Sequence, residues 1–118
     1  YSEEAIKMFK IADEIDTGVG GVTARKMAEK IAAIALQGQV LCITHLPQIA
    51  AFADRHIYIE KQSTNGRTAT ELTVLDEQQR INELMRMASG SSGSKAAYDS
   101  AAELLAEAQR LKKTELLQ

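Results

Sequence analysis

The first half of the chain alternates between apolar runs and amphipathic spacing. Residues 8–12 are mostly apolar and end directly before two acids, which predicts a short strand in spite of Lys10. Residues from about 23 to 36 carry apolar side chains at helical spacing, and Gly38 suits the end of that helix. Residues 39–44 form a continuous apolar run, the pattern of a strand buried on both faces. This order predicts a parallel strand pair joined by a right-handed crossover.

The middle of the chain predicts a short helix followed by a hairpin. Pro47 is well placed to begin the helix, because proline suits the first helical position. Residues 55–61 alternate between apolar and polar positions, and a Thr-rich run follows at 68–75. Two such runs on either side of Asn65-Gly66 predict a β-hairpin with a tight turn.

Two helices complete the predicted fold. Asp76 and Gln79 have the spacing of a capping box ahead of an apolar stripe over 81–88. A Ser/Gly run at 89–94 is typical of a flexible connector, and helical spacing returns over 95–111. The predicted fold class is therefore α/β, with a parallel strand pair, a β-hairpin and C-terminal helices.

Composition narrows the functions open to this fold. Residues 1–118 are expected to form a single domain, because a chain of this length buries one core. Sixteen acids against fourteen bases leave a net charge of -2, which argues against a domain-wide electrostatic grip on nucleic acid. The single cysteine excludes an internal disulfide and a Cys-rich zinc site. No apolar stretch approaches the roughly 18 residues of a membrane span, so a soluble intracellular protein is expected.

Asp13 and Glu14 are the first candidates for chemistry. They end an apolar strand, and ligands of open α/β sheets bind beyond the carboxyl ends of strands. One acid can hold Mg²⁺, directly or through water, and the other can orient or deprotonate a water molecule. A solvated acidic pair at a strand end is the competing interpretation, with about even weight from spacing alone.

A glycine-rich loop and a histidine are the other candidates. Gly18, Gly20 and Gly21 precede a helix, whose free N–H groups suit a phosphate, although a plain tight turn explains them equally well. The dinucleotide fingerprint fails at Thr23, and no P-loop pattern occurs. His45 ends the second strand, where an imidazole can donate to a phosphate oxygen or simply cap the next turn. If the strands are parallel neighbours, these three features converge on one sheet edge.

Two stretches together carry a specific resemblance. They read Asp-Glu-Ile-Asp-Thr-Gly-Val-Gly-Gly at 13–21 and Ile-Thr-His-Leu-Pro-Gln-Ile-Ala at 43–50. This combination closely resembles the RecN family of bacterial DNA repair proteins, in the SMC-like branch of the ABC-type ATPases. The resemblance extends from about residue 13 to residue 113, nearly the whole chain. It implies the fold of a C-terminal lobe of a P-loop NTPase head of the ABC/SMC type.

The resemblance implies a role for each motif residue. Asp13 matches the Walker B aspartate that supports Mg²⁺, and the resemblance implies that this contact runs through water. Glu14 matches the catalytic glutamate that positions or activates the attacking water. His45 matches the switch histidine that contacts the γ-phosphate. These roles agree with the needs of phosphoryl transfer, which are a metal, an oriented water and neutralised charge.

The loop after the acids matches the D-loop, which crosses the dimer interface in this ATPase class. Thr17, Gly18 and Gly20 fall on its positions. Many ABC proteins have Asp where Gly20 stands, although glycine looks normal for RecN-like sequences. Residues 1–12 resemble the family least, because Lys10 interrupts the apolar strand expected there.

The Walker A loop, the glutamine loop, the Ser-Gly-Gly signature and the coiled coil of the family are not present in these 118 residues. The resemblance therefore implies ATP and Mg²⁺ as cofactors of a longer protein, with neither ATP bound tightly nor hydrolysed by the isolated chain. The implied partners are the missing N-terminal head lobe, the second head of a homodimer and DNA, with no membrane. Cytoplasmic localisation is expected, with nucleoid association of the longer protein. The implied function is DNA double-strand break repair and recombination.

Two other interpretations remain open from the sequence. The chain is alternatively a non-catalytic interaction or dimerisation module, with the apolar helix face over 81–88 as its docking surface. A weaker interpretation is another ABC or SMC member, such as a transporter ATPase, although the loop at 16–21 favours the RecN type.

Overall fold

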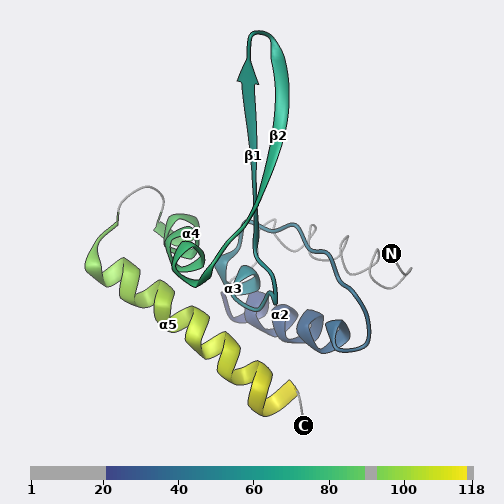
Figure 1. Ribbon diagram of the computed structural model, residues 1–118. Coiled ribbons are helices and arrows are strands. Elements are labelled where there is room, and N and C mark those ends of the chain that lie inside the picture. The colour runs from purple at the N-terminus through teal and green to yellow at the C-terminus, as the bar shows by residue number, and fades with distance from the viewer. Residues whose placement is uncertain (1–20, 90–92, 117–118) are drawn as a thin grey trace.

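The computed structural model describes residues 21–89 and 93–116. The predicted strand at 8–12 lies outside these residues, as do three positions of the connector predicted at 89–94. Within the described ranges, four α-helices form the body and a two-stranded antiparallel hairpin stands away from them (Figure 1). No helix in these ranges is long and apolar enough to cross a membrane.

Helix α2 spans Gly21–Ala35 and buries part of the apolar face that its spacing predicts. Ile31 is buried and Met27 packs against the core, whereas Ile34 is exposed. Ala24 and Ala28, each 1% exposed, complete the buried face. The core of the molecule is rich in alanine, and small side chains let helices approach closely. The buried face is therefore turned toward the alanine positions, and counting large apolar residues alone places it only in part.

The strand predicted at 39–44 is absent, and with it the predicted parallel pair is not seen. In this segment Val40 and Cys42 pack against the core, whereas Leu41 and Ile43 are exposed. A continuous apolar run becomes a strand only if another strand is available for its backbone to pair with. Both strands of the described ranges, β1 and β2, pair with each other.

The hairpin follows its prediction closely. Strand β1, Ile57–Thr64, pairs with β2, Arg67–Val74, in antiparallel register that closes at the pair Thr64 and Arg67. The turn residues Asn65 and Gly66 have φ of 54° and 76°, the left-handed backbone that a tight two-residue hairpin turn requires. Local turn chemistry therefore fixes the position of the hairpin.

The last helices also follow the sequence pattern. Helix α4, Glu77–Ser89, starts at the predicted capping box: the Gln79 N–H donates to Asp76 Oδ1 at 2.8 Å, and the Asp76 N–H donates to Gln79 Oε1 at 2.9 Å. Helix α5, Lys95–Leu111, begins with Ser94, whose hydroxyl oxygen accepts from the Ala97 N–H. A short π-helix, Lys112–Leu116, follows α5.

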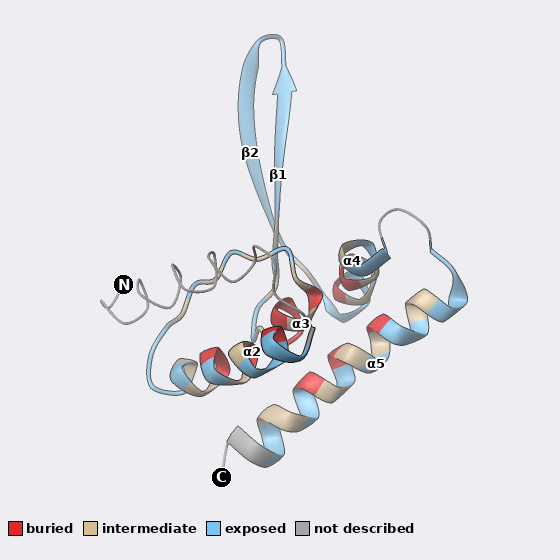
Figure 2. Cartoon of the chain, turned by 180° about the vertical axis from the view of Figure 1, so that it is seen from behind, coloured by how far each residue is buried: buried red, intermediate tan, exposed pale blue. Residues whose placement is uncertain are grey.

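One hydrophobic cluster joins the helices (Figure 2). Short helix α3, Pro47–Ala50, begins at the proline as predicted, and packs between α2 and α4. Leu84 of α4 and Leu105 of α5 are almost fully buried, at 0% and 1% exposed. The apolar stripe over 81–88 therefore packs against the core, and the docking surface predicted there by the interaction-module alternative is wrong.

Candidate functional site

The predicted site residues divide into two groups. Asp13, Glu14, Thr17, Gly18 and Gly20 lie outside the described residues, so their placement stays a prediction. His45 is described, and it is exposed. Its position between the segment 39–44 and helix α3 is therefore the part of the candidate site whose geometry can be described.

His45 sits in a tight bend at the start of α3. The Leu46 N–H donates to the Thr44 hydroxyl oxygen at 3.0 Å, which closes the bend around the histidine. Leu46 is extended, with φ of -94° and ψ of 120°, and buried Pro47 begins the helix immediately after it. The hydrogen bond before α3 and the start of the helix therefore fix the backbone on either side of His45, and the residue is exposed at the surface.

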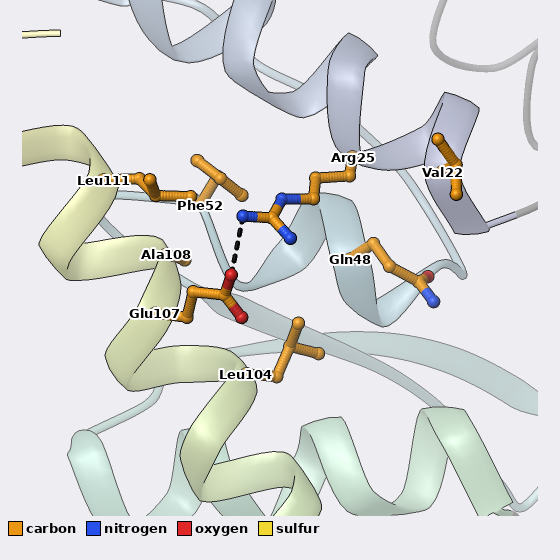
Figure 3. A pocket seen from close by; sticks show the side chains of 8 residues that line it. All are labelled: Val22, Arg25, Gln48, Phe52, Leu104, Glu107, Ala108 and Leu111. Carbon is orange, nitrogen blue, oxygen red and sulfur yellow. Dashed lines mark ion pairs between the residues drawn. The ribbon is translucent and has the colours of Figure 1, made fainter. Parts of the chain in front are cut away.

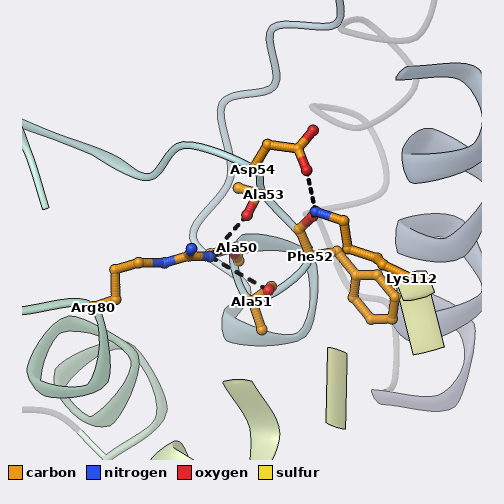
Figure 4. A network of polar contacts seen from close by, with 7 residues as sticks. All are labelled: Ala50, Ala51, Phe52, Ala53, Asp54, Arg80 and Lys112. Atoms are coloured by element: carbon orange, nitrogen blue, oxygen red, sulfur yellow. Dashed lines mark hydrogen bonds and ion pairs between the residues drawn. The ribbon is translucent and has the colours of Figure 1, made fainter. Parts of the chain in front are cut away.

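The far end of α3 is held by two cations from the C-terminal half of the chain (Figure 4). Arg80 Nη2 donates to the carbonyl oxygens of Ala53 at 2.9 Å and of Ala50 and Ala51 at 3.4 Å each. Lys112 Nζ donates to the Phe52 carbonyl oxygen at 2.9 Å. Carbonyls at a helix C-terminus have no intrahelical partner and favour positive charge, so these contacts anchor the turn.

Lys112 also forms an ion pair with Asp54, the residue that follows this turn. Burial lowers the pKa of Arg80 from its ordinary value, whereas the negative charges of Asp54 and Glu77 oppose that shift. Arg80 is 9% exposed. Its spacing of four residues from Leu84 is the signal that places it on the buried face of α4.

Helix α2 supports the other side of the candidate site. It starts at Gly21, directly after the predicted D-loop positions, and its buried alanines pack it against α3. The helix that begins at the end of the first motif therefore lies against the helix that ends the second motif. This arrangement is compatible with a site shared by both motifs.

A pocket of about 320 Å³ lies between α2, α3 and α5 (Figure 3). Arg25 and Glu107 form an ion pair across it, with Nη2 and Oε1 2.6 Å apart. Phe52 and Leu104 contribute apolar walls. Because the two charges neutralise each other, the pocket offers no net positive charge to a phosphate. Over the described ranges, no group of three His, Cys, Asp or Glu side chains gathers as a metal site would require.

His56 lies just before β1, and its side chain is half-buried where the hairpin meets α4. In the part of the chain that is described, its Nδ1 has no hydrogen-bond partner. Burial lowers the pKa of His56 and the charge of Arg80 lowers it further, whereas Glu83 raises it.

Several known proteins are similar to this chain in sequence, and all of those described here are RecN proteins of bacteria. DNA repair protein RecN of Bacillus subtilis is 46% identical over 104 residues, or 88% of this chain. RecN of Deinococcus radiodurans is 45% identical over 96 residues, and RecN of Vibrio cholerae 39% over 95. These matches cover 80–88% of the chain.

The chain matches the C-terminal part of RecN. It spans only 17–18% of the length of these RecN relatives. No protein-family model matches it. A match to Treponema pallidum RecN covers 105 of the 118 residues, which leaves at most 13 outside at the two ends. Glu14, His45 and the whole hairpin therefore fall inside the region shared with RecN.

Proposed function

We propose that this chain is the C-terminal lobe of the ATPase head of a RecN-like protein that acts in DNA double-strand break repair and recombination. In this proposal it supplies the Walker B, D-loop and switch-histidine residues for ATP hydrolysis. The similarity to RecN of several bacteria carries the proposal, since the match to Treponema pallidum RecN includes Glu14 and His45. Those relatives are named DNA repair proteins.

The proposed mechanism gives each motif residue one task. Asp13 would hold Mg²⁺, which would supply positive charge at the phosphates, and Glu14 would orient the water that attacks the γ-phosphate. His45 contacts the γ-phosphate, where negative charge must be neutralised during transfer. The observed bend supports this last task, because it fixes the backbone of His45 while leaving its side chain exposed.

ATP and Mg²⁺ are the proposed cofactors of the longer protein. Its proposed partners are the N-terminal part of the head, a second head across the D-loop residues Thr17, Gly18 and Gly20, and DNA. In this scheme ATP joins two heads and hydrolysis releases them. The proposed location is the cytoplasm, at the nucleoid.

Full-length RecN containing this chain provides the test. Glu14→Gln should lower kcat by roughly 10²–10⁴-fold, the usual contribution of a group that acts on the proton of a nucleophile. His45→Ala should lower kcat by roughly 10²-fold, the cost of removing one donor to developing charge. Binding of a fluorescent ATP analogue should persist in the Glu14→Gln protein.

Glu60→Gln is the matched control, because Glu60 is an exposed acid of the hairpin outside the candidate site. It should leave kcat unchanged. Wild-type hydrolysis by both Glu14→Gln and His45→Ala would instead support the non-catalytic interaction module. Magnesium-dependent hydrolysis by the isolated 118-residue chain, abolished by Glu14→Gln, would contradict the expectation that this chain needs the rest of the head.

A further inference from the structure

Helix α5 is firmly held in the body around one of its acids, Glu107. The neighbouring residues Leu105 and Ala108 are each 1% exposed, and both belong to the hydrophobic cluster. Just after α5, Lys112 Nζ donates to the Phe52 carbonyl oxygen at 2.9 Å, which ties the end of the helix to the turn after α3. The backbone that carries Glu107 is therefore fixed on both sides.

The Glu107 carboxylate reaches from this support to the first part of α2 (Figure 3). Its Oε1 lies 2.6 Å from Arg25 Nη2, which is a short, charge-assisted contact. Arg25 Nε also faces Oε1 of Glu29, an acid of its own helix, at 3.7 Å. The pocket of about 320 Å³ lies between the helices here, and Val22, which lines it, is 73% exposed. The ion pair therefore links α2 to α5 where apolar packing between them is incomplete.

Arg25 stands close to the predicted D-loop in the chain. Helix α2 begins at Gly21, and Gly18 and Gly20 precede it directly in the sequence. With about 3.6 residues in a turn, Arg25 is about one turn from the start of the helix. Whatever fixes Arg25 therefore also fixes the point at which the D-loop enters α2.

Helix α5 also relates α2 to the segment that carries His45. Helix α3 begins at Pro47, shortly after His45, and the turn that follows α3 accepts the hydrogen bond of Lys112 (Figure 4). The C-terminal part of the chain thus contacts α2 through Glu107 and the turn after α3 through Lys112. It thereby connects the two segments that adjoin the sequence motifs.

The ion pair contributes little to the stability of the fold by itself. The Arg25 and Glu107 side chains are 45% and 32% exposed, and a pair in such a setting is weakened by water and salt. Loss of the pair should therefore leave the domain folded. Its main effect is to restrict the first turn of α2 to one position against α5.

We propose that Arg25 and Glu107 are positioning residues for ATP hydrolysis by the longer protein. Their ion pair holds the start of α2 and so sets where the D-loop stands relative to His45. Neither residue contacts ATP, and each acts through the D-loop. The inference rests on the proposed function, because it takes from it the D-loop role of the residues before Gly21.

Steady-state ATP hydrolysis by full-length RecN containing this chain tests the proposal. Glu107→Gln and Arg25→Met each remove one partner of the ion pair, and the double variant removes both. Arg25→Lys keeps the positive charge. Glu103→Gln is the matched control, because Glu103 is an exposed acid about one turn earlier on α5. Thermal unfolding followed by circular dichroism checks that each variant is folded at the assay temperature.

Each single loss should lower kcat roughly tenfold and change the KM for ATP by less than about twofold. A small misplacement of catalytic geometry slows the chemical step more than it weakens binding. The double variant should be no slower than either single variant, because both substitutions remove the same contact. Arg25→Lys should recover most of kcat, and Glu103→Gln should match the wild type.

Wild-type kcat in both Glu107→Gln and Arg25→Met overturns the proposal. Additive losses in the double variant also overturn it, as does an equal loss in Glu103→Gln. If Glu107→Gln is unfolded, Arg25→Met and Arg25→Lys decide the matter, and equal kcat values for these two overturn the proposal. Full hydrolysis by Glu14→Gln would remove the proposed function itself, whereas an inactive Glu14→Gln beside a fully active Glu107→Gln removes this inference alone.

Discussion

Replacing Arg80 by methionine tests how much the contacts between its guanidinium and the backbone of α3 and the following turn stabilise the fold. Arg80 is 9% exposed, and its Nη2 reaches three carbonyl oxygens, of which that of Ala53 is closest at 2.9 Å. One nitrogen carries two N–H groups, so two full hydrogen bonds are the most it can make. A hydrogen bond from a charged donor contributes roughly 1.5–3 kcal/mol.

Part of that contribution is offset in the wild-type protein. Arg80 Nε has no hydrogen-bond partner among the described residues, and burial of the cation opposes folding. Methionine fills a similar volume without leaving a large cavity. We therefore expect Arg80→Met to lower the free energy of unfolding by about 2–3 kcal/mol, which is a large share of the stability of a small domain.

Equilibrium urea unfolding of the 118-residue chain, followed by circular dichroism, measures this loss. Arg86→Met is the matched control on the same helix. Arg86 is exposed, pairs with Glu83 and lies over Tyr58, contacts that together contribute about 0.5–1 kcal/mol at a surface. A loss from Arg80→Met no larger than that from Arg86→Met would refute the view that Arg80 anchors the turn after α3.

Three further stability predictions follow from individual positions. Gly66→Ala should cost about 1 kcal/mol, because φ there is 76°, whereas Gly38→Ala, with open space around it, should be neutral by the same urea assay. Leu105→Ala should cost roughly 2–5 kcal/mol, since this side chain is almost fully buried; a loss below 1 kcal/mol, measured by thermal unfolding, would disagree. The pKa of His56 lies below its ordinary value of 6.5 in the folded chain, so the unfolded chain takes up the proton first. Stability should therefore fall as pH drops below about 6.5, and His56→Gln should remove this part of the pH dependence in unfolding curves at several pH values.

Elements specified by neighbouring residues were predictable from the sequence. The Asn65-Gly66 turn, the Asp76 capping box and the limits of α5 all agree with the structure, because each depends on contacts within a few residues. Pro47 likewise begins α3 where its fixed φ suits a first turn.

Features that depend on residues far away in the sequence were harder to predict. Residues 39–44 have the apolar pattern of a buried strand, but pairing depends on another segment and not on their own composition. The spacing from Leu84 indicates that Arg80 lies on the buried face of α4, but the three carbonyl oxygens that receive its guanidinium come from α3 and the turn after it, about 30 residues away, and no local pattern predicts them. Of the candidate site, the structure describes His45, whereas the acids and the D-loop remain sequence predictions.

Reconstitution of a complete ATPase head tests whether this chain supplies catalytic residues. The chain is co-expressed with the remaining N-terminal part of a RecN protein, and ATP hydrolysis by the purified complex is measured beside a Glu14→Gln version. The wild-type complex should hydrolyse ATP in the presence of Mg²⁺, and the Glu14→Gln complex should not. A stable complex without activity, or one equally active with Glu14→Gln, would contradict the claim that this chain supplies the catalytic half of the head.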